Sequence, residues 1–187
     1  MKVAVKRAQF LEKKINENNY SIGVEVGVQA GKTFKHLIEN SNELILYGVD
    51  GWFLDKNTRL TEQPLEGTEP SSNYYSLKKW IEEHNVSHRA FLVRSYTHTC
   101  LDKFEDESLD FVFIDADHTY KGVKKDTLNW SKKVKPGGLV SGHDSNYPSI
   151  QKFIQEIPTN LQIQRDIGFS DMNYAIDNVW WYYKRQW

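Results

Sequence analysis

The sequence has almost no cysteine and no long apolar run, and both absences narrow what the protein can be. Its only cysteine in 187 residues is Cys100, so no disulfide can form within the chain, and we expect this thiol to fill space in the core. No apolar run approaches the roughly 20 residues that a membrane-spanning helix needs. The first residues, MKVAVKRAQFLEKKI, lack the uninterrupted apolar stretch of a secretory signal. We therefore expect a cytoplasmic protein with no membrane partner.

An excess of one charge is also missing. The chain carries 24 lysines and arginines against 25 acids, for a formal net charge of -1. The densest basic run, from Lys121 to Lys135, is interrupted by Asp126 and is typical of a solvated helix face. A nucleic-acid partner is therefore not expected. With 39% hydrophobic and 26% charged residues, the composition predicts one globular domain over residues 1–187.

Hydrophobic periodicity predicts helices and strands in alternation. The helices are expected at 3–18 (within an N-terminal cap, 1–20), 32–39, 73–84, 97–104, 120–134 and 149–157. The strands are expected at 22–26, 44–49, 90–93, 109–114, 139–141, about 161–167 and 178–184. Lys135-Pro136-Gly137-Gly138 is expected to break the chain between helix and strand. Residues 51–72 form a long loop, which a compact domain usually keeps for its active site.

This alternation predicts an α/β fold: a doubly wound, mostly parallel, seven-stranded sheet that ends in an antiparallel hairpin. In such sheets the ligand binds beyond the carboxyl ends of the strands, where the strand order reverses. Several expected strands end next to polar or charged side chains. They are Asp50, Arg94, Ser95, Asp115, His143 and Asp144.

The bend after the first strand, VEVGVQAGKTF, is open to several interpretations. Its Gly31-Lys32-Thr33 resembles the end of a phosphate-binding loop, but the pattern G-x-x-x-x-G-K-[ST] needs glycine at the position of Val26. The dinucleotide pattern G-x-G-x-x-G fails as well, because Glu25 stands at its first glycine and Gly31 comes one residue late. A nucleotide hydrolase is thus the less favoured alternative.

The ordered set VEVGVQAGKT, YGVDGW, VRS, LDFVFIDADHTY and KPGGLVSGHD resembles class I S-adenosylmethionine-dependent methyltransferases. It is most similar to the small O-methyltransferases with a metal-assisted site, in the branch that carries FIDADH and GHD. The resemblance extends from about Ile22 to the last strand and implies a Rossmann-like fold. It also implies S-adenosyl-L-methionine as methyl donor and a small hydroxylated acceptor, such as a sugar, a phenol or a natural-product-like molecule.

The resemblance implies a set of donor-binding residues. Gly27 and Gly31 would let the backbone approach the donor, and Thr33 would bind its carboxylate near a helix N-terminus. Asp50 would accept hydrogen bonds from both ribose hydroxyls, and Ser95 would lie near the adenine. The full set is Glu25, Gly27, Gly31, Thr33, Asp50, Ser95 and Asp115.

The resemblance also implies a catalytic centre. Asp115, His143 and Asp144 match positions that bind a divalent metal, Asp115 and His118 are the catalytic candidates, and His118 matches the general base. Because His143 stands where relatives carry an oxygen ligand, manganese, iron or zinc would suit the set better than magnesium. In the alternative interpretation, Asp117 caps the following helix, His118 is an exposed bystander, and His143 and Asp144 only line a pocket.

The acceptor is the part that the sequence defines least. An aromatic rim suits a sugar or a phenol equally, and it is expected from Trp52, Phe53, Arg59, Tyr74, Tyr75 and Tyr147. Trp52 would either cover the adenine or pack in the core. The C-terminal WWYYKRQW would either pack within the last hairpin or form a homodimer contact. A related enzyme of another reaction type and a non-catalytic donor-binding module are further alternatives.

Overall fold

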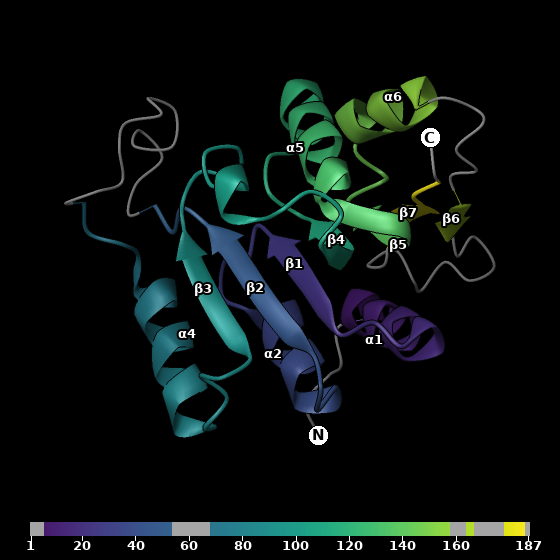
Figure 1. The fold of residues 1–187 in the computed structure, drawn as a ribbon. Helices are drawn as coiled ribbons and strands as arrows, with labels where there is room; N and C mark the ends of the chain where they lie inside the picture. Colours follow the sequence, from purple (N-terminus) through teal and green to yellow (C-terminus); the bar gives the residue numbers. More distant parts are fainter. Residues whose placement is uncertain (1–5, 54–67, 158–163, 167–177, 186–187) are drawn as a thin grey trace.

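A seven-stranded sheet forms the centre of the structure, a computed structural model that describes residues 6–53, 68–157, 164–166 and 178–185 (Figure 1). Its strands lie in the order β3-β2-β1-β4-β5-β7-β6. Their bounds are Ile22–Val26 (β1), Ile45–Asp50 (β2), Ala90–Arg94 (β3), Leu109–Ile114 (β4), Val134–Gly142 (β5), Gln164–Asp166 (β6) and Val179–Tyr183 (β7). Strands β1 to β5 are parallel, and β7 is antiparallel to β5 and β6. The predicted fold class is confirmed.

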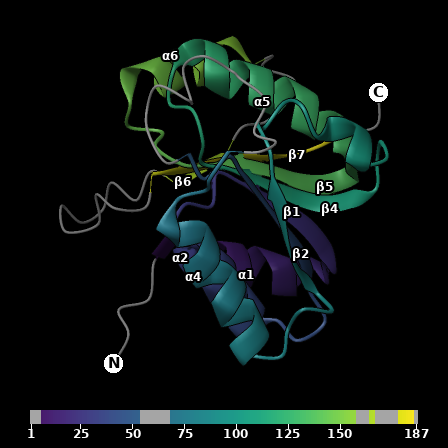
Figure 2. The ribbon, with the colours of Figure 1, turned by 90° about the vertical axis from the view of Figure 1, so that its left-hand side faces the viewer.

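The strand order places a switch point beside β1. From β1 the chain moves outward through β2 to β3, and it then returns to place β4 on the other side of β1. The helices that follow β1 and β4 lie on opposite faces of the sheet (Figure 2). A crevice therefore opens between the carboxyl ends of these two strands, which is where α/β sheets of this kind bind ligands.

Two layers of helices cover the sheet (Figure 2). Helices α1 (Lys6–Asn18), α2 (Lys32–Asn40) and α4 (Ser72–Glu83) lie on one face, and α5 (Tyr120–Lys133) and α6 (Pro148–Glu156) lie on the other. These bounds agree closely with the predicted helices, although Val3 of the predicted opening helix lies outside the described residues. In the described ranges, no helix has both the length and the apolar character needed to cross a membrane.

Strand β4 shows how the two hydrophobic cores arise from one apolar run. Successive side chains of a strand point to opposite faces of the sheet. Phe111 and Phe113 therefore pack with the α1, α2 and α4 layer, whereas Val112 and Ile114 pack with the α5 and α6 layer. From Phe111 to Ile114 the run FVFI is continuously apolar because both of its faces are covered.

The aromatic residues of β7 divide between the same two cores. Trp180 is fully buried and meets Phe153 of α6 with ring centroids 5.8 Å apart, whereas Trp181 meets Phe10 of α1 at 4.7 Å. Tyr182 joins Trp180 in the α5 and α6 core. Trp180, Trp181 and Tyr182 thus pack within one chain, while Arg185 is exposed and the last two residues of WWYYKRQW lie outside the described ranges. A homodimer stays a prediction.

Strand β5 differs from the expected course of the chain. Helix α5 ends at Lys133, one residue before its predicted end, but the expected break at 135–138 lies inside β5. Two backbone hydrogen bonds explain this, because Gly137 N donates to Lys184 O at 2.6 Å and Lys184 N donates to Gly138 O at 2.8 Å. Gly137 has a φ of 83°, so glycine permits an irregular segment that still pairs with the chain after β7.

The predicted helix over 97–104 is also reduced, to one 3-10 turn at Leu101–Lys103. A long-range contact competes with helix formation here, because Trp130 Nε1 donates to the carbonyl oxygen of Thr97 at 3.0 Å. That carbonyl would otherwise accept the first hydrogen bond of the expected helix. Cys100 stands just before the turn and is fully buried, in keeping with a packing role.

Candidate functional site

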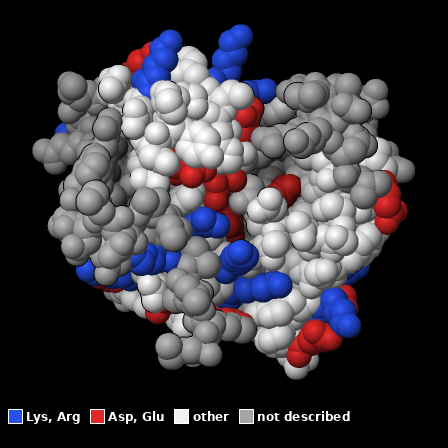
Figure 3. Space-filling view, turned by 180° about the vertical axis from the view of Figure 1, so that it is seen from behind, with Lys and Arg blue, Asp and Glu red and all other residues white. Residues whose placement is uncertain are grey.

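A cavity of about 660 Å³ opens at the carboxyl ends of β1, β2, β3 and β4. This volume lies within the roughly 300–1,000 Å³ of small-molecule sites. The cavity is lined by His118 and by every predicted donor-site residue except Gly31. On the face seen in Figure 3, acidic atoms gather in a recess near the centre, with lysine and arginine atoms along its lower border. The strand ends thus bring together side chains that lie far apart in the sequence.

The bend after β1 depends on its two glycines. Gly27 has a φ of 89°, and a Cβ atom there would lie 2.2 Å from the carbonyl oxygen of Asp115. Gly31 has a φ of 71° and precedes α2, and a Cβ atom there would lie 2.7 Å from a Leu77 methyl carbon. Side chains would therefore obstruct the approach of the bend to β4 and α4, and the left-handed conformation favours glycine as well.

Asp50 holds this bend in place from the end of β2. Its Oδ2 atom accepts hydrogen bonds from Val28 N at 2.9 Å and Gln29 N at 2.8 Å, and its Oδ1 atom accepts one from Trp52 N at 2.7 Å. A carboxylate offers about four lone-pair sites, so Oδ1 can still accept a further bond from a ligand. The sequence predicted only a ligand-binding role, and the structure adds a role in shaping the bend.

Glu25 is the most unusual acid of the cavity. It is only 3% exposed, and its Oε2 atom has no hydrogen-bond partner among the described residues. Burial, together with the charge of Asp115, raises the pKa of Glu25 well above its usual range, while Arg7 acts in the opposite direction. An unsatisfied buried polar group costs about 1–3 kcal/mol, so such a group in a cavity indicates a site that a ligand completes.

Arg7 is a cavity residue that the sequence analysis missed. Its Nε atom donates to Thr33 Oγ1 at 3.0 Å and lies 3.9 Å from Asp115 Oδ2. It therefore joins α1, the first turn of α2 and the end of β4 at one point. The sequence held one signal, because Arg7 lies four residues before Leu11 and eight before Ile15, on the apolar face of the opening helix.

Three side chains beside the cavity converge as a metal site would require. One ligand atom each from Asp115, His118 and Asp144 can be chosen so that all lie within 4.8 Å of one another. His118 Nε2 is 2.6 Å from Asp144 Oδ2 and 3.4 Å from Asp115 Oδ1. His143, the third predicted ligand, falls outside this set, although its Nδ1 atom lies 3.0 Å from Asp144 Oδ1. His143 Nδ1 also lies 3.8 Å from Asp115 Oδ1, so both histidines stand beside the two aspartates, and the ligand set of Asp115, His143 and Asp144 stays a prediction.

The alternative that made His118 a bystander agrees poorly with this arrangement. Its side chain is 40% exposed, yet its ring lies between two carboxylates. The expected cap by Asp117 is also wrong, because Thr119 is the N-cap of α5 and its hydroxyl accepts a bond from Gly122 N at 3.0 Å. Asp117 instead accepts from Thr119 N at 2.9 Å and so shapes the turn before the cap.

The two carboxylates change the protonation of His118. Contacts with Asp115 and then Asp144 raise the pKa of His118 from 6.5 to about 9. Burial alone would raise the pKa of Asp144, but His118 and His143 hold it well below its usual range. In the protein without ligands, His118 is therefore a cation at pH 7. The role of His118 as general base stays a prediction, and acting as a base would require this ring to lose its proton.

We expect His118 to titrate near pH 9 in the metal-free protein, and Asp144→Asn to bring its pKa back toward 6.5. Because the folded-state pKa is the higher one, the charged ring stabilises the fold fully below about pH 6.5. This stabilisation is lost as the pH rises through about 9. Imidazole NMR shifts measured against pH would check the prediction, and a pKa at or below 6.5 in the unsubstituted protein would contradict it.

The predicted aromatic rim is only partly exposed to the cavity. Trp52 is 2% exposed, its Nε1 atom donates to Gln29 O at 2.9 Å, and its ring meets Tyr74 at 5.1 Å. It lines the cavity, but it is packed into the core at the same time. Tyr147 is 48% exposed and stacks on His118 with centroids 5.4 Å apart. Arg59 lies outside the described residues, as does most of the 51–72 loop.

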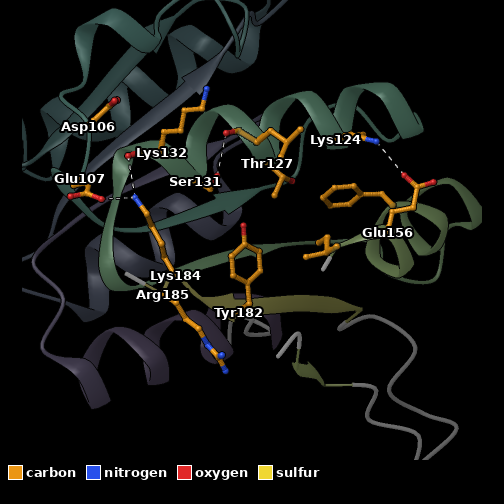
Figure 4. Close-up of a pocket in the computed structure, with 13 residues that line it drawn as sticks. Asp106, Glu107, Lys124, Thr127, Ser131, Lys132, Glu156, Tyr182, Lys184 and Arg185 are labelled. Carbon is orange, nitrogen blue, oxygen red and sulfur yellow. Dashed lines mark hydrogen bonds and ion pairs between the residues drawn. The ribbon is translucent and has the colours of Figure 1, made fainter. Parts of the chain in front are cut away.

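A second cavity, of about 490 Å³, lies between α5, α6 and β7 (Figure 4). Its described lining residues include none of those predicted for the site. Two of its lysines are engaged in ion pairs, Lys124 with Glu156 at 3.2 Å and Lys184 with Glu107 at 3.1 Å. Of the residues predicted at the strand ends, Asp50, Ser95 and Asp115 line the larger cavity, and none is among the described residues that line the smaller one.

The fold and the site define a class of α/β proteins that bind a cofactor at the switch point of a doubly wound sheet. The chain belongs to a methyltransferase family, because residues 24–145 match the family described as "Methyltransferase domain". The match includes the bend, Asp50, Asp115, His118 and the His143-Asp144 pair. It confirms the resemblance to class I methyltransferases and decides against a nucleotide hydrolase.

Solved structures with this fold come from several bacteria. A candidate caffeoyl-CoA O-methyltransferase from Staphylococcus aureus matches with a TM-score of 0.69 and 12% identity, over 98% of this chain and 85% of that one. The cofactor-bound protein Rv0187 from MTB has a TM-score of 0.68 and 14% identity, over 100% and 83% of the two chains. A candidate O-methyltransferase from Klebsiella pneumoniae has a TM-score of 0.67 and 16% identity, over 98% and 82%. At these identities the likeness shows the fold.

One curated relative is similar over part of the sequence. The protein called "Uncharacterized protein y4gI" from Sinorhizobium fredii is 38% identical over 67 residues. These residues make up 35% of this chain and 7% of the relative, so the chain spans a small part of that protein's length.

Proposed function

We propose that the protein transfers the methyl group of S-adenosyl-L-methionine to a hydroxyl oxygen of a small acceptor. The acceptor oxygen would attack the sulfonium methyl, forming an O–CH₃ bond as the S–CH₃ bond breaks, and S-adenosylhomocysteine would leave. The hydroxyl proton passes to a base. Family membership supports methyl transfer, and the O-methyltransferases among the structural neighbours favour oxygen as the target.

The observation that carries the donor assignment is Glu25. A buried carboxyl with an unpartnered oxygen suits a cationic ligand, and S-adenosylmethionine carries a sulfonium and an ammonium group. Around it, the Gly27 bend would admit the donor at close range, and Asp50 would bind its ribose hydroxyls through the lone pairs that remain. Ser95, which lies beside Asp50 through its N–H bond to Asp50 O at 3.0 Å, would approach the adenine.

A divalent ion also fits the residues beside the donor cavity. Asp115, His118 and Asp144 would hold it through two oxygens and one nitrogen, a set that suits manganese, iron or zinc better than magnesium. Such an ion lowers the pKa of a hydroxyl group that binds to it. His118 would need to lose its proton to act as a ligand or as a base, and its raised pKa near 9 works against this at pH 7. We therefore expect activity to rise with pH toward 9.

Glu25→Gln is expected to weaken donor binding while stabilising the fold. The amide keeps the volume of the side chain but loses the charge that would pair with the donor, so the Kd should rise about 10- to 100-fold. Stability should increase by up to about 1–2 kcal/mol because a buried ionisable group disappears. Calorimetry and urea unfolding would measure the two effects. If Glu25→Gln lowered both the donor affinity and the stability, the result would point to a structural role for Glu25.

Donor binding should also depend on pH. Since the pKa of Glu25 is raised in the empty cavity, a bound cation would favour the carboxylate and release a proton. Affinity should therefore fall as the pH is lowered. Calorimetry in two buffers with different ionisation enthalpies would detect the proton, and Glu25→Gln should abolish its release.

Binding and turnover together test the proposed function. S-adenosylmethionine would be titrated with and without Mn²⁺ or Mg²⁺, and production of S-adenosylhomocysteine would be followed on a panel of phenols and sugars. Lack of binding at millimolar donor would exclude the proposal. Tight binding without turnover on any acceptor would favour a donor-binding module instead.

A further inference from the structure

Arg7 reaches the cavity because of its place on α1. Leu11 and Ile15, one and two turns later on the same face, are 0% and 2% exposed and fix this face against the rest of the molecule. The side chain of Arg7 is itself 22% exposed and lines the cavity. An arginine at the end of an apolar stripe is therefore directed toward the site rather than toward bulk water.

Contacts with the described residues use only a small part of the hydrogen-bonding capacity of Arg7. A guanidinium group carries five N–H donors, and here the Nε donor is taken up by Thr33 Oγ1 at 3.0 Å. Within the described ranges, its two terminal amino groups donate no hydrogen bond. The closest acid in the described part of the chain, Asp115, lies 3.9 Å from Nε, which is beyond hydrogen-bond length. A fork of donors is thus available to a planar, two-oxygen anion.

The surroundings of Arg7 suit the two charges of an amino acid. Helix α2 begins at Lys32 without a side-chain cap at Gly31, so its first N–H groups and its positive end are open to an anion. Thr33, in that first turn, is 1% exposed. Glu25 and Asp115 also lie near the guanidinium, and their carboxyl groups suit an ammonium group. Sites for an anion and for a cation therefore adjoin each other.

We propose that Arg7 positions the methyl donor by pairing its guanidinium group with the donor's α-carboxylate. The opening helix then completes the donor site, and Thr33 acts by holding the Arg7 side chain as well as through the helix end. This inference rests on the proposed function, because it presupposes that the cavity binds S-adenosylmethionine.

The test compares two ligands that differ at the amino acid end. S-adenosylhomocysteine carries the α-carboxylate, whereas 5′-methylthioadenosine keeps the nucleoside and the thioether but has neither carboxylate nor amino group. By calorimetry, Arg7→Ala should raise the Kd for S-adenosylhomocysteine roughly 10- to 100-fold, as expected for the loss of a charge-assisted hydrogen bond. The Kd for 5′-methylthioadenosine should change less than about twofold. Arg7→Lys should recover part of the loss, because it restores the charge without the fork.

Lys13→Ala provides the matched control, since this cation on the same helix is 72% exposed and, among the described residues, forms an ion pair with Glu17 alone, at 3.8 Å. It should leave both affinities unchanged. The inference would be overturned if Arg7→Ala lowered the affinity for both ligands equally, or lowered neither. If the alanine variant folds poorly, Arg7→Lys gives the same comparison. If the unsubstituted protein binds neither ligand, the proposed donor site itself is wrong, and the inference fails with it.

Discussion

Gly27→Ala should lower the free energy of unfolding by about 2–5 kcal/mol and abolish tight donor binding. The left-handed conformation of an alanine, at a φ of 89°, costs about 1–2 kcal/mol. Overpacking adds about 1–3 kcal/mol, because the new Cβ atom would meet the backbone of Asp115 at 2.2 Å. Backbone cannot rotate away as a side chain can, so β1 and β4 would have to separate where the cavity forms. Urea unfolding and calorimetry with S-adenosylhomocysteine would measure both effects.

Gly137→Ala is the control that separates the conformational cost of a left-handed alanine from the cost of overpacking. Gly137 has a φ of 83°, close to that of Gly27, but a Cβ atom there would have no neighbour within 4 Å. Its substitution should cost only the conformational part, about 1–2 kcal/mol, and leave donor affinity intact. If Gly27→Ala and Gly137→Ala lost the same amount of stability and of donor affinity, the close contact with Asp115 would have no special importance.

Asp50→Asn is expected to raise the Kd for the donor about 10- to 150-fold, with a loss of stability as well. The amide nitrogen would face a backbone N–H group in place of an acceptor, so at least one bond to Val28, Gln29 or Trp52 would be lost. Hydrogen bonds to charged groups contribute about 1.5–3 kcal/mol each. The ribose hydroxyls of the donor would lose their anionic partner in the same variant. Calorimetry would give the affinity, and urea unfolding would give the stability.

Asp110→Asn is the matched control for Asp50→Asn. The Asp110 carboxylate also accepts two backbone bonds, from Ser21 N at 2.8 Å and Ile22 N at 3.0 Å, but it lies near the start of β4, at the end of the sheet away from the cavity. Its substitution should lower stability by a similar amount without changing donor affinity. A comparable loss of affinity in both variants would mean that Asp50 acts through general stability alone.

The sheet and the position of the site could be predicted because they depend on local periodicity. The run LDFVFI and the aromatic residues near the C-terminus show their strand character directly. Once the parallel strands are recognised, their carboxyl ends must meet at one edge, so Gly27, Asp50 and Asp115 could be placed together in advance. The 3-10 turn at Leu101–Lys103 was mispredicted because a distant indole group takes up a backbone carbonyl, which no local pattern reveals.

The choice of partners within the site could not be predicted in the same way. Asp144 has a φ of 57°, and its carboxylate reaches His118, 26 positions earlier in the chain, at 2.6 Å. The spacing of His118 and His143 contains nothing to indicate that both rings would lie beside the two aspartates. Arg7 is a similar case, since its helical spacing shows which face it occupies but not that this face meets the first turn of α2.

The amino-acid sequence by itself determined which residues form strands, which polar groups stand at their ends and which family the bend belongs to, because each of these depends on neighbours within a few positions. Only the tertiary structure decided that Glu25 is buried with one oxygen unpartnered among the described residues, that His118 lies beside two carboxylates that raise its pKa, and that Arg7 lines the cavity. These properties depend on desolvation and on charges brought close from separate elements. Both arise when the chain has folded.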